Sequence, residues 1–230
     1  LNTDTIIPDD LIRAILKSRV DLLWNGGIGT YIKACSENNI DIGDKANDPL
    51  RVNGHEVRAK VIAEGGNLGL SQLGRIEYAI NGGTMNTDFI DNSAGVDCSD
   101  HEVNIKIALN SAVISKKIST EERNAVLEQM TESVEDLVLV DNYDQNLALT
   151  ILERSNTLNV ESFSQLIKEL EKEGLLNSEV EFLPNQSELS RRAVSGEGMT
   201  RAELSVLLSY SKMSLDVDLS ESSFTEEEYF

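Results

Sequence analysis

The sequence predicts an α/β region over residues 1–90 followed by an all-helical region over residues 91–230. Two segments, 20–34 and 61–81, each combine a short apolar strand, a glycine-rich turn and a helical pattern. Beyond Ser119, capping patterns precede apolar residues at three- and four-residue spacing, which is typical of amphipathic helices. In α/β folds, glycine turns that follow strands form loops at the strands' carboxyl ends, where ligands bind. The segment from Val57 to Ile107 is therefore the expected functional centre.

Composition limits the function classes. Of 230 residues, 40 are acidic and 20 are basic, so the formal charge is −20. Such a surface repels nucleic acid and anionic membranes, and no apolar run approaches the length of a membrane span. Two cysteines are too few for a disulfide framework, and with two histidines they show no zinc-binding spacing. We expect a cytoplasmic protein that is part of a longer chain and has no metal site.

The first strand and its turn are ambiguous. Pro8 and two following acids open a helix that should end near Ser18. A strand over Val20–Trp24 then leads into the turn Asn25–Thr30 and a helix from Tyr31. The turn matches only the first half of the dinucleotide motif G-x-G-x-x-G, because Ile32 occupies the third glycine position. A phosphate cradle, another ligand-facing loop and a tight turn all remain open.

The next segment predicts a hairpin, a strand and a helix. Asn53-Gly54 between the arms Leu50–Val52 and His55–Val61 is typical of a type I′ hairpin turn. The second arm continues into a strand over Val61–Ala63, which breaks at Glu64–Asn67. A helix over Ser71–Asn81 should end at the following glycine pair, and Thr84–Thr87 is a short strand candidate.

The remaining residues predict helices. One begins at Asp88–Asp91 and runs to about residue 117, and the last 17 residues, which carry six acids and no base, are expected to fray. Between them, capping boxes and apolar spacing predict these segments: a helix after Ser119–Glu122, then Asn142–Asn156, Val160–Glu173 ended by Gly174, and Leu204–Met213 after the box Thr200–Glu203.

Few side chains suggest chemistry by themselves. Glu64 directly follows a strand, so it is either a general base or an acid that caps the next turn. Asn67 and Asn92 each lie in a turn after a predicted strand and offer a donor and an acceptor without charge. They suit a carboxamide or a ribose hydroxyl, although ordinary turn asparagines would look the same. No Ser/His/Asp order, carboxylate dyad or Walker loop is present.

Two motifs resemble a known family. Ala63–Asn67 resembles the A-E-G-A-N of the glutamate and amino-acid dehydrogenases, and without a gap Asp88–Val96 aligns with their P-D-x-x-A-N-A-G-G-V. Ser99 then falls on the serine of their substrate helix. Further segments look like one branch, the large bacterial NAD-specific glutamate dehydrogenases: Trp24–Tyr31, Leu50–Val57, Asp91–Ile107, Glu181–Pro184 and Gly198–Leu204.

The resemblance implies oxidative deamination of L-glutamate to 2-oxoglutarate and ammonium with NAD. It also implies the fold, the second half of a Rossmann-type domain followed by a helical domain. Val96 and Ser99 would meet the substrate, and Asn92 would hold the nicotinamide carboxamide. The implied cofactor-binding residues are Asn25, Gly26, Gly27, Glu64, Gly65, Gly66, Asn67 and Asn92.

The departures from the family are equally informative. The family's catalytic Lys and Asp and its G-x-G-x-x-G turn lie upstream of this segment, and neither Lys33 nor Lys60 has the required glycine-rich context. Thr87 replaces the motif's proline, and Ala94 its first glycine. We therefore expect no catalytic residue here, inactivity of the isolated chain, and partnership with the rest of its own chain.

Half a sheet would leave an exposed edge strand, which favours self-association into a homo-oligomer. The alternative is a non-catalytic helical module for subunit interaction or regulation, with residues 119–230 as its functional part and the glycine turns purely structural.

Overall fold

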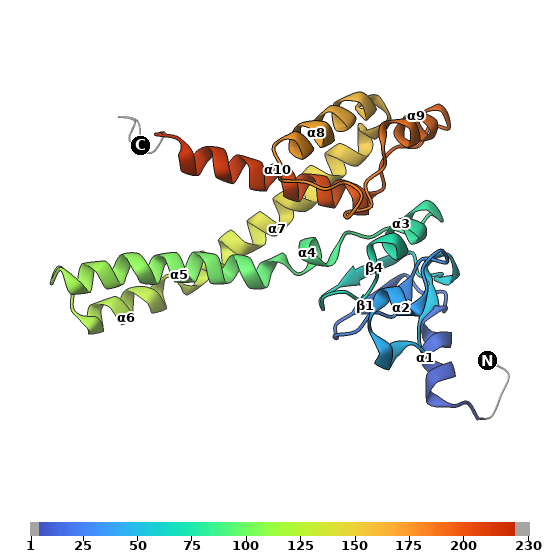
Figure 1. The fold of residues 1–230 in the computed structure, drawn as a ribbon. Coiled ribbons are helices and arrows are strands. Elements are labelled where there is room, and N and C mark those ends of the chain that lie inside the picture. The colour runs from blue at the N-terminus through green and yellow to red at the C-terminus, as the bar shows by residue number, and fades with distance from the viewer. Residues whose placement is uncertain (1–4, 224–230) are drawn as a thin grey trace.

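The computed structural model describes residues 5–223, apart from the side chain of Thr157. This part of the chain is mostly helical, with four short strands near one end (Figure 1). A helical arm formed by α5 and α6 projects to the opposite side, and α7 leads from it back to the remaining helices (Figure 1).

The α/β part follows much of the predicted pattern. Pro8 lies in the first turn of α1, with two acids beside it. The Ser71 side chain accepts a hydrogen bond from the Gly74 N–H at the start of α3, and Gly82 follows its end with φ of 90°. The elements are α1 (Pro8–Leu16), β1 (Leu22–Asn25), β2 (Ile32–Lys33), α2 (Asn39–Ile42), η1 (Lys45–Asn47), β3 (Val52–Asn53), η2 (Gly54–Glu56), β4 (Val61–Glu64) and α3 (Gln72–Ile80).

The strands form two parallel pairs. β1 pairs with β4 in a register that places Leu22 opposite Val61 and Asn25 opposite Glu64. β2 pairs with β3, so that Lys33 lies opposite Asn53. Because parallel strands end at the same edge, the residues that follow each pair are neighbours in space.

The prediction of a helix from Tyr31 was wrong. The segment is strand β2, held by hydrogen bonds from distant main-chain donors. The Val52 N–H donates to the Tyr31 carbonyl at 2.9 Å, and the Ser71 N–H donates to the Ile32 carbonyl at 3.0 Å. Such long-range pairing overrides a weak local helical preference.

The predicted Asn53-Gly54 hairpin was also wrong. Asn53 instead begins the 3₁₀ turn η2, where it and Glu56 form a capping box. Gly54 does not adopt the positive φ that a type I′ turn requires. A glycine is needed for another reason, because a Cβ there would lie 2.6 Å from the Gly74 carbonyl oxygen of α3. The glycine at position 54 thus reflects close contact with helix α3. Local sequence alone cannot distinguish this requirement from that of a hairpin turn.

The helical part confirms both predicted capping boxes. Ser119 pairs with Glu122 at the start of α6, and Thr200 pairs with Glu203 at the start of α10. Gly174 lies just beyond α8 with φ of 75°. The elements are α4 (Asp88–Asp91), α5 (Ser93–Ile114), α6 (Thr120–Gln129), α7 (Thr131–Arg154), η3 (Asn156–Leu158), α8 (Val160–Lys172), α9 (Gln186–Val194) and α10 (Arg201–Glu221).

Several boundaries differ from the prediction. α7 runs without a break from Thr131, not from residue 142, and α10 extends to Glu221 through residues that were expected to fray. Residues 224–230 lie outside the described part. Thr84–Thr87 forms only an isolated bridge, between Thr84 and Val61. α9 was not predicted, although the Asn185 side chain accepts from the Glu188 N–H and provides a capping signal.

Buried apolar side chains form two clusters. One packs around β4 and α3 and includes Ile62, Leu70 and Tyr78. The other lies among the helices and includes Leu149 and Leu204. Polar contacts join the two parts: Arg201 of α10 donates to Asn86 at 2.6 Å, and Asn86 donates to Asn146 of α7 at 2.9 Å. The helices are thereby fixed against the α/β part.

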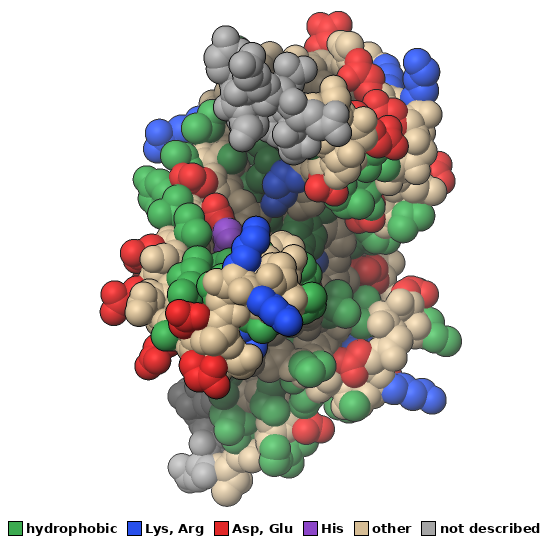
Figure 2. All heavy atoms as spheres, turned by 90° about the vertical axis from the view of Figure 1, so that its left-hand side faces the viewer, with side chains coloured by type: hydrophobic (Ala, Val, Ile, Leu, Met, Phe, Trp, Pro, Cys, Tyr) green, Lys and Arg blue, Asp and Glu red, His purple; other side chains and the backbone are tan. Residues whose placement is uncertain are grey.

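The surface carries acidic and hydrophobic side chains together. Figure 2 shows both kinds scattered over the face toward which the α5–α6 arm projects. No helix within residues 5–223 has the length and apolarity to cross a bilayer.

A buried ion pair joins α9 to α10. Arg192 donates to both carboxylate oxygens of Glu203, at 2.8 and 3.1 Å, and the Glu203 side chain is 1% exposed. The same carboxylate accepts the Thr200 N–H at 2.6 Å. Glu203 therefore caps one helix and neutralises a cation from another.

We predict that Glu203→Ala lowers the free energy of unfolding by about 3–5 kcal/mol, because it leaves the Arg192 guanidinium buried without its principal partner. Glu122→Ala is the matched control, since Glu122 holds the same capping-box position at an exposed site. That control should cost at most about 1 kcal/mol. Urea denaturation measures both, and equal small losses would contradict the role of the pair.

Candidate functional site

Two glycine turns meet at the carboxyl ends of β1 and β4. The N–H groups of Gly65 and Gly66 both donate to the Asn25 carbonyl, at 2.9 and 3.0 Å. A Cβ at Gly66 would lie 2.4 Å from the Gly27 carbonyl oxygen. The turns therefore touch through their main chains, and a side chain at Gly66 would separate them.

The Trp24 ring lies against both turns. A Cβ at Gly65 would be 2.2 Å from the ring, and one at Gly26 would be 2.8 Å from the indole nitrogen. Gly27 differs, because a Cβ there would meet nothing within 4 Å. Gly66 is thus required by main-chain packing, a side chain at Gly26 or Gly65 would displace the exposed Trp24 ring, and Gly27 faces open space.

The turns form the walls of a groove of about 660 Å³. The acidic residue that lines the groove is Asp44. Its carboxylate accepts hydrogen bonds from the Thr30 N–H at 2.8 Å and the Asn47 amide at 2.7 Å. These hydrogen bonds, that from Asn47 most of all, lower the pKa of Asp44, so it is ionised at neutral pH. The other lining residues carry no charge and are 26–30, 42, 43, 47, 65–68 and 92.

Glu64 lies behind this groove. Its side chain is fully buried, and Arg75 of α3 donates to it at 2.8 and 3.2 Å. Arg75 also contacts Asp88 at 3.0 Å, so one guanidinium serves two carboxylates. Burial raises the pKa of Glu64, although Arg75 acts in the opposite direction.

The two carboxylates hold the turn through its main chain. Glu64 accepts the Leu70 N–H at 3.2 Å, and Asp88 accepts the Leu68 N–H at 2.8 Å. Leu68 needs such support because its φ is 59°, a conformation that L-residues rarely adopt. Glu64 thus shapes the turn from inside, and its carboxylate does not line the groove. This position resembles the predicted turn-capping acid more than a general base.

Asn67 and Asn92 lie between the groove and a second cavity. The Asn92 amide donates to the Asn67 side-chain oxygen at 2.8 Å. Both residues line the groove and also a cavity of about 870 Å³ bounded by α5, α7 and α10. Val96 lines this second cavity, whereas Ser99 lies exposed on α5 outside its wall.

The second cavity contains a lysine that the sequence analysis missed. Lys212 reaches it from α10 and donates to the Gln145 side chain at 2.8 Å. Burial lowers its pKa, and no ion pair involving Lys212 occurs among the described residues. Asp97 and Asp216 also line the cavity. Lys212 is exposed at the edge of the cavity, and an ammonium without a bonded carboxylate can accept an anionic ligand.

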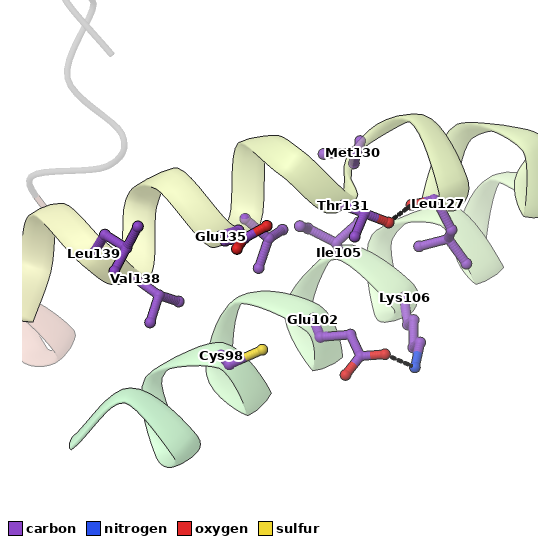
Figure 3. Close-up of a pocket in the computed structure, with 11 residues that line it drawn as sticks. Cys98, Glu102, Ile105, Lys106, Leu127, Met130, Thr131, Glu135, Val138 and Leu139 are labelled. Carbon is purple, nitrogen blue, oxygen red and sulfur yellow. Dashed lines mark hydrogen bonds and ion pairs between the residues drawn. The ribbon is translucent and has the colours of Figure 1, made fainter. Parts of the chain in front are cut away.

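A third cavity, of about 470 Å³, lies between α5 and the α6–α7 segment (Figure 3). Figure 3 shows Ile105, Leu127 and Met130 facing it, with the ion pair between Glu102 and Lys106 on one helix. Its lining is mainly apolar and lacks the convergent polar groups of the other two cavities. It suits packing rather than chemistry.

The family model for the catalytic domain of bacterial NAD-glutamate dehydrogenase matches residues 1–152. The chain belongs to that family. A model for the C-terminal part of glutamate dehydrogenase matches residues 196–230. Both matches agree with the resemblance seen in the two motifs.

Curated relatives support the assignment. The chain is 52% identical over 229 residues to the NAD-specific glutamate dehydrogenase of Pseudomonas aeruginosa, with 100% of this chain covered. It is 49% identical to proteins of the same name from Halomonas elongata and Mycobacterium tuberculosis, over 95% and 97% of this chain. The chain spans only 14% of the length of each relative.

In this chain of the glutamate dehydrogenase family, the structure brings most of the expected site residues together. The groove is lined by Gly26, Gly27, Gly65, Gly66, Asn67 and Asn92, with Asn25 supporting it through its carbonyl. Val96 lies beyond Asn92, in the second cavity. Glu64 and Ser99 stand apart, the first behind the turns and the second on the outer surface of α5.

We predict that Arg75→Met destabilises the protein by about 3–5 kcal/mol, because it leaves two buried carboxylates without a cation. Arg191→Met is the control, since Arg191 forms an ion pair with Glu188 but its side chain is 68% exposed. Loss of an exposed pair should cost at most about 1 kcal/mol. Chemical denaturation compares them, and a small loss for Arg75→Met would show that the cluster does not hold the turns.

Proposed function

We propose that this chain is part of an NAD-dependent glutamate dehydrogenase that converts L-glutamate to 2-oxoglutarate and ammonium. The observation that carries the proposal is the position of Asn92, on the boundary between the glycine-walled groove and the second cavity. A residue there can contact a cofactor on one side and a substrate on the other. The names of the relatives support the same reaction.

The groove fits part of a dinucleotide. The open space at Gly27 would admit a ligand directly against the main chain. The ionised Asp44 suits a ribose hydroxyl and disfavours a phosphate beside it. When bound, NAD would supply the hydride acceptor. Asn25, Gly26, Gly27, Gly65, Gly66 and Asn67 would shape its site, and Asn92 would orient its carboxamide; Glu64 would act from behind.

The second cavity would hold the dicarboxylate substrate. Val96 would contact its apolar part, and the Lys212 ammonium would pair with one carboxylate. Ser99, one turn farther along α5, would act only if the helix or another part of the full-length protein moved it toward the ligand. The family's catalytic Lys and Asp would come from the rest of the chain, so the present segment would be inactive alone.

In the full-length protein, residues 1–90 would form the second half of a Rossmann-type domain and residues 91–230 a helical domain. Two separate apolar clusters support a division near this boundary, with Ile90 already part of the helical cluster. Among the described strands, β1 pairs only with β4, and its Leu22 and Trp24 are 54% and 60% exposed. Strands from the rest of the chain would cover that edge. The free state of both cysteines is compatible with a cytoplasmic location.

A second candidate function, a helical interaction module, is supported by α7. Within residues 119–230, large apolar side chains lie exposed on α7, which leads back from the arm, among them Leu139 at 64% and Ile151 at 58%. Such surface favours contact with another copy of the chain in a homo-oligomer. This role does not exclude catalysis by the full-length protein.

We predict that Gly27→Leu in the full-length enzyme weakens NAD binding at least about tenfold, or about 1.4 kcal/mol, without changing Tm. A Cβ at Gly27 would meet no atom within 4 Å, so a leucine has room to start and would extend into the groove. Gly66→Ala is the contrasting variant, because its Cβ would strike the Gly27 carbonyl and should lower both Tm and affinity. Calorimetric NAD titration decides, and unchanged affinity for Gly27→Leu would refute the groove assignment.

The substrate assignment makes a separate prediction. Lys212→Met should raise the KM for 2-oxoglutarate at least about tenfold and leave the KM for NADH unchanged, because only the dicarboxylate would contact the ammonium. Lys106→Met on α5 is the control and should change neither constant. Steady-state kinetics of the full-length enzyme provides both values.

The variants Asn92→Asp and Ser99→Ala test whether these two residues contact the cofactor and the substrate. A lost carboxamide hydrogen bond at Asn92 should cost about 1–3 kcal/mol of NAD affinity. If Asn92→Asp and Ser99→Ala leave NAD affinity and the glutamate KM unchanged, the residues are structural. The interaction module would then be the better description of this segment.

A further inference from the structure

A cluster of metal-binding side chain types lies on the β2–β3 pair, apart from the groove. Cys35, His55 and Glu77 place a sulfur, an imidazole nitrogen and a carboxylate oxygen within 4.8 Å of one another. We propose that this cluster binds a zinc-class divalent cation with three protein ligands and an open fourth position. The sequence predicted no metal site because the three ligands are far apart along the chain and show no zinc-binding spacing.

Strand register brings two of the ligands together. Lys33 lies opposite Asn53 in the parallel pair, and Cys35 and His55 each follow two residues later. They therefore emerge at the same edge. Their proximity follows from parallel pairing and does not depend on a flexible side chain.

Helix α3 provides the third ligand. It packs closely against η2, as shown by the lack of room for a Cβ at Gly54, which would also lie 3.2 Å from the Glu77 Cβ. The Cys35 N–H donates to Glu77 Oε2 at 2.7 Å, and the His55 N–H donates to Oε1 at 2.9 Å. Main-chain donors thus orient the carboxylate, as outer partners orient metal ligands.

The distances suit a small cation. His55 Nδ1 lies 2.7 Å from Glu77 Oε1, within hydrogen-bonding distance. Zinc bonds of about 2.0 Å to nitrogen and about 2.3 Å to sulfur place ligand atoms about 3–4 Å apart. Side-chain adjustments of less than about 1 Å would open the required space.

Charge balance and ligand type identify the class of ion. Binding replaces the thiol proton of Cys35, which is released to solvent, and uses neutral imidazole. One thiolate and one carboxylate then balance a divalent ion. Thiolate with imidazole selects zinc or cobalt over magnesium and calcium. The nearby Lys33 ammonium is engaged elsewhere, with the Ala34 carbonyl at 3.0 Å and Asn53 at 2.8 Å.

Another cluster in the described residues provides an internal comparison. His101 lies 3.5 Å from Asp97 and 3.3 Å from Asp141. It contains no thiolate, so a metal bound there would give a different spectrum.

The test is a titration of the reduced protein, without NAD, with Co²⁺ alone. We expect a single bound ion with a thiolate-to-cobalt absorption band. Cys35→Ser should abolish the band, and His55→Asn should weaken binding at least about tenfold. Both variants keep the main-chain donors to Glu77, and circular dichroism checks that they remain folded.

Cys98→Ser and His101→Asn are matched controls, and both should retain the band and the affinity. Zn²⁺ should raise the Tm of the wild-type protein but not that of Cys35→Ser. Absence of the band from the wild-type protein would overturn the proposal. So would a band that survives Cys35→Ser or disappears in Cys98→Ser. None of these readouts depends on glutamate dehydrogenase activity.

Discussion

One arginine connects the interior of this protein to its glycine turns. Arg75 of α3 lies between the carboxylates of Glu64 and Asp88, which belong to β4 and α4. Those carboxylates in turn hold the N–H groups of Leu70 and Leu68. The shape of the second glycine turn therefore depends on an ion cluster whose residues do not line the groove. This turn, through Gly66, also limits the position of the first.

The sequence was informative where local chemistry decides the structure. The capping boxes at Ser119 and Thr200 correctly predicted the starts of two helices. The apolar segment Val61–Ala63 correctly predicted a strand. Local signals failed where distant contacts decide. Gly54 suggested a hairpin, but its small size accommodates α3. The structure separates α6 from α7 at Met130, whereas the prediction began a new helix only at Asn142.

The residues of the candidate site also divide into those that local sequence motifs indicate and those that only distant contacts bring to the site. The motifs around Asn67 and Asn92 indicated both residues, and the structure joins them by a hydrogen bond. Lys212 had no comparable signal, because it lies more than a hundred residues after Asn92 and enters the cavity only through the packing of α10. From the sequence, Glu64 was either a general base or an acid that caps the next turn. Only its partner on α3 shows that it belongs to the interior.

Trp24 has a consequence beyond packing. It is the single tryptophan of the chain, and its ring lies against glycines of both turns while remaining 60% exposed. An indole in this position senses solvent and neighbouring dipoles at the groove. Its fluorescence is therefore an intrinsic optical reporter of the two turns, and any event that moves them would change the emission without an attached label.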